Sequence, residues 1–137
     1  MITHFSHTFA EARSHFLKLC EASADSLEHL VHPLPGPDGE LFTDVALWGS
    51  HECSHLLVVS SALHGIEGYA GSGLQSLLLA EGLSQQLPNG TSLMMIHAIN
   101  PHGFAWQRRV NESNIDLNRN FVDHQQPPLN LAYRDIA

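Results

Sequence analysis

The sequence predicts an α/β fold with a mixed central sheet and helices on both faces of that sheet. Two continuous apolar runs, residues 56–60 and 93–99, are rich in Val, Leu, Met and Ile, as buried strands are. Between them, the segment 69–87 repeats leucines at helical spacing, and Pro88-Asn89-Gly90 closes it. A strand, a helix and a second buried strand, in this order, almost always form a right-handed βαβ unit.

Two further elements are predicted before this unit. Thr8 and Glu11 have the spacing of a capping box, which marks a helix start. A loop rich in Pro and Gly, residues 32–39, stops the helix, and residues 41–48 then read as a strand. After the second apolar strand the chain is polar and irregular, and residues 129–137 have the pattern of a helix start. Apolar residues recur at intervals of three and four along the first segment, as on one helix face: Phe5, Phe9, Ala12, Phe16, Cys20, Ala24, Leu27 and Val31.

Length, charge and composition restrict the class of protein. With 137 residues, the chain is one domain or part of one. Its net charge of −8 argues against nucleic acid as a partner. No apolar run is long enough to span a membrane, and the N-terminus lacks the basic start and apolar core of a signal peptide. The two cysteines have no metal-type spacing, so we expect free thiols and a cytoplasmic protein without a membrane partner.

The strongest local signal for a site is the turn His64-Gly65-Ile66-Glu67-Gly68, which follows the first apolar run. Its two glycines allow a sharp bend, and ligands of open α/β sheets lie beyond the carboxyl ends of such strands. An imidazole and a carboxylate are ligand types that a catalytic zinc prefers. The alternative is a histidine that ends a strand and a glutamate at a helix N-terminus, where the helix dipole favours it.

A second short motif is a competing zinc candidate. The run His51-Glu52-Cys53-Ser54-His55 matches the H-E-x-x-H pattern, in which two histidines one turn apart on a helix bind zinc. Here the run lies between two predicted strands, beside Gly49 and Ser50, so a connection is expected in place of a helix. We therefore predict that this match is not a metal site.

Cations gather in one short stretch of an otherwise acidic chain. Arg108, Arg109 and Arg119 lie within twelve positions of one another. Such a local cluster indicates an anion site, since guanidinium groups match carboxylates and phosphates. The alternative is a set of surface salt bridges.

Three motifs, HGIEG, NPHGF and RRVNESNIDLNRNF, stand in the order and spacing that resemble the zinc carboxypeptidase family. The closest likeness is to a bacterial branch of uncharacterised carboxypeptidase-like proteins, related to succinylglutamate desuccinylase and aspartoacylase. The resemblance covers nearly the whole chain and is weakest over the first forty residues. It implies a phosphorylase/hydrolase-like zinc carboxypeptidase fold with Zn²⁺ as cofactor.

The resemblance also implies roles for individual residues. His64 and Glu67 resemble the first two zinc ligands. Arg109, with Arg108 as the alternative register, resembles the arginine that polarises the scissile carbonyl and stabilises the oxyanion. Asn118 and Arg119 resemble the pair that binds the terminal carboxylate of the substrate. The implied activity is hydrolysis of a peptide or N-acyl amino acid amide bond next to a free carboxylate.

Two functional residues of the family pattern have no counterpart in this chain. The family takes its third ligand, a histidine, and a glutamate general base from its C-terminal half, and His97, His102 and His124 stand in no matching context. We therefore expect residues 1–137 to be the N-terminal portion of a single catalytic domain, inactive by itself, with an exposed apolar edge strand. The alternative is a non-catalytic carboxylate-binding or interaction module without a complete zinc site.

Overall fold

The computed structural model describes residues 4–127 of the chain. None of the helices in this range is long and apolar enough to cross a lipid bilayer. The helix start predicted for residues 129–137 lies outside the described residues. The elements follow one another as α1 (Phe9–Glu21), β1 (Ser26–Val31), β2 (Phe42–Trp48), β3 (His55–Ser60), α2 (Gly68–Ala80), the 3₁₀ helix η1 (Leu83–Gln85), β4 (Thr91–His97), α3 (Pro101–Ala105) and the 3₁₀ helix η2 (Leu117–Arg119).

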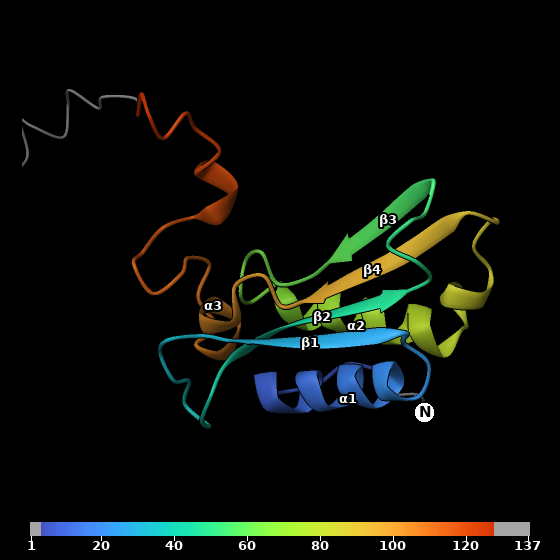
Figure 1. Ribbon diagram of the computed structural model, residues 1–137. Coiled ribbons are helices and arrows are strands. Elements are labelled where there is room, and N and C mark those ends of the chain that lie inside the picture. Colours follow the sequence, from blue (N-terminus) through green and yellow to red (C-terminus); the bar gives the residue numbers. More distant parts are fainter. Residues whose placement is uncertain (1–3, 128–137) are drawn as a thin grey trace, which may run out of the picture.

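The four strands form one mixed sheet in the order β1-β2-β4-β3 (Figure 1). β1 pairs antiparallel with β2, and β2 pairs antiparallel with β4. β3 and β4 are parallel and are connected through α2, as a βαβ unit requires. The predicted α/β class and mixed sheet are therefore confirmed.

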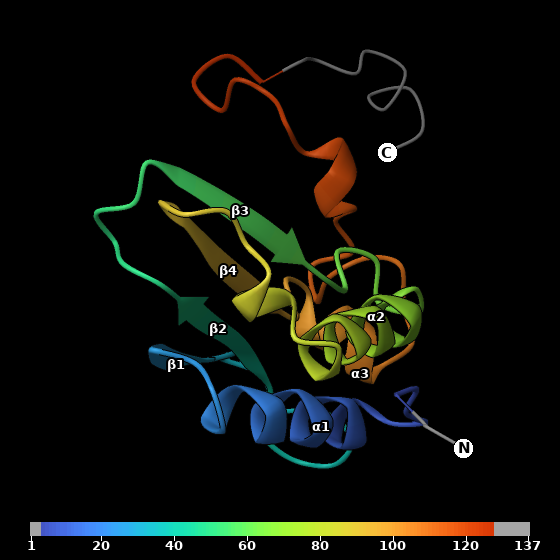
Figure 2. The same cartoon turned by 90° about the vertical axis from the view of Figure 1, so that its right-hand side faces the viewer.

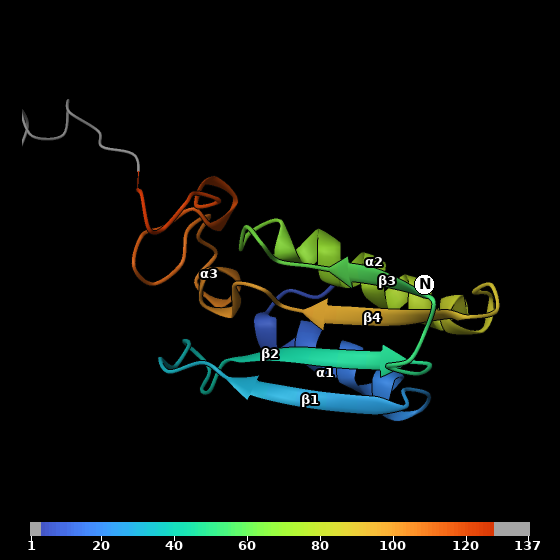
Figure 3. The same ribbon diagram turned by 45° about the horizontal axis from the view of Figure 1, so that its top comes forward.

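Both long helices pack on the same face of the sheet (Figures 2 and 3). Phe16 of α1 and Leu79 of α2 belong to one core cluster with Leu93 and Met95 of β4. The sequence predicted helices on both faces, whereas no helix covers the opposite face within residues 4–127. The reason is that α1 and α2 lie side by side and share one layer of core side chains.

The helix predicted to run as far as Val31 is wrong beyond Glu21. The Thr8 hydroxyl accepts from the Glu11 N–H at 3.1 Å and caps the helix start as predicted. At the other end, the Ala24 N–H donates to the Cys20 carbonyl at 2.7 Å, and the chain then enters β1. Pairing with β2 decides the conformation of this segment, and Leu27 still reaches the core from a strand.

The helix predicted over residues 69–87 ends early, at Ala80. Gly82 adopts a left-handed conformation with φ of 77°, which stops the helix before the short 3₁₀ helix η1. Leu83 and Leu87 nevertheless pack against the core, so the leucine repeat continues without a continuous helix.

The first apolar run was predicted as a strand buried on both faces, and this is wrong for β3. Leu56, Leu57 and Val58 are 48%, 40% and 50% exposed. The physical reason is that β4 is the only strand that pairs with β3 in the described part of the chain, so β3 forms the edge of the sheet. The exposed apolar edge strand expected for half a domain is therefore present.

Both cysteines are free thiols, as predicted. Cys20 is buried in the core beside Phe16, and burial raises the pKa of its thiol to about 12. The thiol is therefore protonated at neutral pH and has little nucleophilic character.

Candidate functional site

The turn after β3 is held against the segment that follows α3. The Gly65 N–H donates to the Arg108 carbonyl at 3.0 Å. A Cβ atom at Gly65 would overlap the Gly103 carbonyl and the Arg108 carbonyl oxygen. Glycine is therefore required by close approach of the backbones, and this contact places His64 beside the loop that follows α3.

A second backbone connection comes from Asn100, which is 2% exposed and caps α3. Its side-chain oxygen accepts from the Gly103 N–H at 2.8 Å, and its own N–H donates to the Ala62 carbonyl at 2.9 Å. The NPHG segment and the HGIEG turn are thereby joined at the carboxyl ends of β3 and β4.

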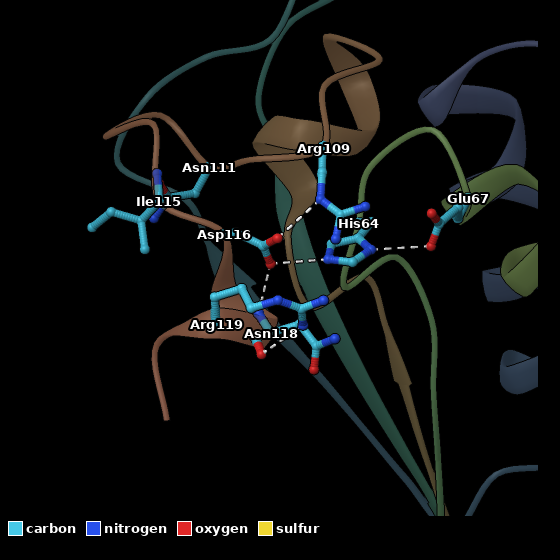
Figure 4. A network of polar contacts seen from close by, with 8 residues as sticks. All are labelled: His64, Glu67, Arg109, Asn111, Ile115, Asp116, Asn118 and Arg119. Atoms are coloured by element: carbon cyan, nitrogen blue, oxygen red, sulfur yellow. Dashed lines mark hydrogen bonds and ion pairs between the residues drawn. The ribbon is translucent and has the colours of Figure 1, made fainter. Parts of the chain in front are cut away.

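His64 lies between two carboxylates (Figure 4). Its Nδ1 is 3.2 Å from Glu67 Oε2, and its Nε2 is 2.9 Å from Asp116 Oδ1. The His64 side chain is 10% exposed, whereas that of Glu67 is 67% exposed. Each ring nitrogen therefore faces one acidic oxygen, in a partly shielded position.

Asp116 is the centre of the polar network. Its Oδ2 accepts from Arg109 Nε at 2.9 Å, and its Oδ1 also accepts from the Asn118 N–H at 2.9 Å. The hydrogen bond with His64, followed by those from Arg109 and Asn118, lowers the pKa of Asp116 to about 2. Asp116 is therefore a carboxylate at neutral pH.

Asp116 has no role that was predicted from the sequence, although it lies within the motif RRVNESNIDLNRNF. Asp116 caps the 3₁₀ helix η2. This local role is by itself an ordinary structural reason for a carboxylate at this position. Its contact with His64 spans 52 positions and could not be read from local spacing.

An open hollow of about 350 Å³ lies beside His64. Glu67 and Asn118 are on its wall, so two of the predicted site residues face the same space as His64. The complete lining consists of Ser60, Ser61, Ala62, Leu63, His64, Glu67, Gly71 and Asn118.

The three arginines differ in what they contact. Arg109 reaches the network through Asp116, while Arg108 Nη2 donates to Asn114 Oδ1 at 3.1 Å and points to a different partner. Arg119 Nη1 donates to the Asn118 carbonyl at 3.3 Å. Of the two registers that the sequence allowed, Arg109 is thus the one in contact with the His64 network. Its ion pair with Asp116 also agrees in part with the alternative of local salt bridges.

The competing H-E-x-x-H run lies where the sequence predicted. His51 is in a turn, and His55 is the first residue of β3. The two histidines do not share a helix face, so this run lacks the geometry that the zinc motif needs.

Comparison with known proteins identifies the family. The model of a family described as "Protein of unknown function (DUF2817)" matches residues 5–137. The chain belongs to this family. No curated protein matches the DUF2817 chain.

Two solved structures are similar to this DUF2817 chain. One is the glutaminyl cyclase of Fimbriiglobus ruber, with 14% identity, a TM-score of 0.39, and coverage of 64% of this chain and 34% of that chain. The other is bovine thrombin-activatable fibrinolysis inhibitor in complex with tick carboxypeptidase inhibitor. It has 14% identity, a TM-score of 0.46, and coverage of 79% of this chain and 38% of that chain. The DUF2817 chain therefore spans little more than a third of either.

The donor set beside His64 fits two positions of a zinc site. Ligands at about 2.0–2.2 Å from a tetrahedral ion lie roughly 3.4 Å apart, and His64 Nδ1 and Glu67 Oε2 are separated by 3.2 Å. Metal-binding histidines usually donate their other N–H to a carboxylate, and Asp116 has this position. Within residues 4–127, no group of three His, Cys, Asp or Glu side chains could hold a metal ion. Zinc and its third ligand stay predictions.

Proposed function

We propose that this DUF2817 chain supplies the substrate-binding groups and two metal ligands of a zinc-dependent hydrolase. The proposed substrate is a peptide or an N-acyl amino acid, whose amide bond is cleaved next to a free carboxylate. One observation carries the proposal: the His64 ring directs Nδ1 toward Glu67 and Nε2 toward Asp116. This is the arrangement that a metal-binding histidine with an orienting carboxylate requires.

In this proposal, His64 Nδ1 and Glu67 would hold the zinc ion. Zinc supplies a Lewis acid and lowers the pKa of a water molecule that it binds. Asp116 accepts the Nε2–H of His64, which keeps this proton on Nε2 and leaves the Nδ1 lone pair free for a metal. The ionised state of Asp116 at neutral pH supports this role.

Recognition of the substrate carboxylate is assigned to Arg119 and Asn118. The Arg119 side chain has one hydrogen bond, to the Asn118 carbonyl, and the other N–H groups of its guanidinium have no partner among residues 4–127. A guanidinium can bind a carboxylate with two parallel hydrogen bonds, and the Asn118 side chain lies on the wall of the hollow.

Arg109 is assigned to the oxyanion. It uses Nε for Asp116, and its side chain is 52% exposed. The terminal nitrogens have no partner in the described part of the chain, so they can donate to negative charge that develops on the scissile carbonyl.

A non-catalytic carboxylate-binding module is the second candidate. The specific observation in its favour is that both His64 nitrogens already face carboxylate oxygens. A protonated His64 would satisfy both contacts without a metal ion, and the arginines could still bind a carboxylate.

Zinc titration separates the two candidates. In a protein that also carries the predicted third ligand, calorimetry should detect one Zn²⁺ per chain, lost in His64→Ala and in Glu67→Ala because each variant removes one ligand. The double variant His51→Ala/His55→Ala is the matched control and should keep the site. Loss of zinc in this control would assign the metal to the H-E-x-x-H run, and no zinc binding in the presence of the third ligand would favour the carboxylate-binding module.

Substrate preference tests the reaction class. An N-acyl amino acid with a free carboxylate and its amidated analogue should be compared, each with zinc and after chelation. In a protein that also carries the third ligand and the general base, we expect zinc-dependent release of the amino acid to be faster from the free acid than from the amidated analogue. Equal hydrolysis of both compounds would contradict the requirement for a neighbouring carboxylate.

A further inference from the structure

The segment from Arg109 to Asp116 forms a compact turn. The Asn111 side-chain oxygen accepts from the N–H groups of Ser113 at 3.1 Å and Ile115 at 2.9 Å. The Asn111 N–H donates to the Ile115 carbonyl at 3.0 Å. The ion pair between Arg109 and Asp116 closes the base of this turn at 2.9 Å (Figure 4). The turn should therefore move as one unit.

The tip of the same turn contacts a distant part of the chain. Glu112 Oε2 lies 3.4 Å from Nε2 of His32, the residue that follows β1. The side chains of His32 and Glu112 are 14% and 30% exposed, so the pair is partly shielded from solvent. The other ring nitrogen of His32 contacts the backbone of Leu34. Nδ1 lies 3.2 Å from the Leu34 backbone nitrogen and 3.0 Å from the Leu34 carbonyl oxygen.

The charges at the tip favour this contact. A backbone hydrogen bond, and then the neighbouring His32 and His102, lower the pKa of Glu112, so it is a carboxylate at neutral pH. The His102 ring lies 6.0 Å from the His32 ring, and Arg108 also affects His102 electrostatically. Glu112 is thus the negative group among His32, His102 and Arg108.

We infer that Glu112 and His32 are positioning residues for His64. The turn is held at its tip by His32 and at its base by His64, and Glu112 and Asp116 belong to the same hydrogen-bonded unit. Release of the tip would let the turn shift, and the contact between Asp116 and His64 Nε2 would loosen. The segment after β1 thereby acts on the candidate metal site. The inference rests on the proposed function only for its effect on zinc.

The first test is the substitution Glu112→Gln, which keeps the shape of the side chain and removes its charge. Partly exposed ion pairs contribute up to about 1 kcal/mol, which corresponds to an affinity change of roughly two- to fivefold. We expect zinc affinity to fall by this factor, and the His64 Nε2–H proton to exchange faster in ¹H–¹⁵N NMR. Ser113→Ala, the next residue of the same turn, is the matched control and should change neither value.

The second test asks whether Glu112 acts through Asp116. In an Asp116→Asn background, Glu112→Gln should have no further effect, because residues that act through one contact are not additive. His32→Phe keeps a ring and removes the donor, and should reproduce Glu112→Gln. Unchanged His64 proton exchange in Glu112→Gln, or full additivity with Asp116→Asn, would overturn the inference. If a protein that also carries the third ligand binds no zinc, the proposed function fails, and proton exchange at His64 still decides the positioning role.

Discussion

His64 Nε2 lies 2.9 Å from Asp116 Oδ1, although the two residues are 52 positions apart. The contact joins the turn after β3 to the loop after α3. A carboxylate at Nε2 favours the tautomer that carries its hydrogen there, and Glu67 Oε2 faces the other ring nitrogen, Nδ1, at 3.2 Å. Three of the predicted site residues, His64, Arg109 and Asn118, meet at this one carboxylate.

The first prediction follows from this contact. Asp116→Asn removes the charge that orients His64, and loss of such an outer partner typically weakens metal binding by about 10–100-fold. Zinc affinity measured by calorimetry should fall by this factor. The control is Asp123→Asn, which changes an aspartate on the same segment. Among residues 4–127, Asp123 Oδ1 accepts only from the Gln125 N–H. Equal affinities of Asp116→Asn and the unmodified chain would show that another group orients His64.

The second prediction concerns the close packing of Gly65. A methyl group at this position would overlap the Gly103 and Arg108 carbonyl groups, which belong to the backbone and cannot rotate away. Overpacking of this kind typically costs about 1–3 kcal/mol. Gly65→Ala should lower the free energy of unfolding in urea by this amount and should also disturb the His64 ring signals in NMR. An unchanged unfolding midpoint would mean that the two backbones lie further apart in solution.

The third prediction concerns the pH dependence of stability. His97 is fully buried, stacks on Phe16, and has Nε2 2.9 Å from Ser72 Oγ. Burial, partly offset by Asp44, lowers the pKa of His97 from 6.5 to about 4. Between these values the unfolded chain binds a proton that the folded chain excludes. The contribution of His97 to stability is therefore complete above pH 6.5 and is lost as the pH falls toward 4.

The measurement is the free energy of unfolding between pH 7 and pH 4 for the unmodified chain and His97→Gln. Gln can keep a hydrogen bond with Ser72 and does not titrate. The slope for the unmodified chain should be the steeper one, by up to roughly 1.4 kcal/mol per pH unit. Parallel curves would show that His97 binds its proton equally well in both states.

The fourth prediction distinguishes the role of Arg119 in substrate binding from the role of Arg109 in stabilising the oxyanion. In a protein that also carries the third ligand and the general base, Arg119→Ala should mainly raise KM for substrates with a free carboxylate, and should do little for an amidated analogue. Arg109→Ala should lower kcat by about 10²-fold or more, as removal of one oxyanion donor does. Steady-state kinetics on the two compounds separates these effects. If Arg119→Ala raised KM equally for both substrates, the segment 116–119 would be a structural turn and not a carboxylate site.

Local chemistry predicted the parts of the fold that depend on neighbouring residues. Thr8 caps α1, the leucine repeat after Gly68 forms α2, and the turn that contains His64 and Glu67 follows β3. The same reasoning placed His51 and His55 outside a helix. Such features follow from spacing of three or four residues, from glycine conformation and from the ends of apolar runs, all of which the sequence contains.

Segments whose conformation depends on a distant partner could not be predicted in this way. Leu27 has helical spacing from α1, and only pairing with β2 makes its segment a strand.

The apolar run of β3 indicated burial, and only its edge position leaves Leu57 and Val58 exposed. The spacing of the arginines left two registers open, and only the fold brings Arg109 to Asp116 and turns Arg108 to Asn114. The sequence by itself thus determined the residue types of the site and the turn that presents His64. The tertiary structure alone decided which of them touch, because hydrogen bonds between remote segments form only after the sheet has brought those segments together.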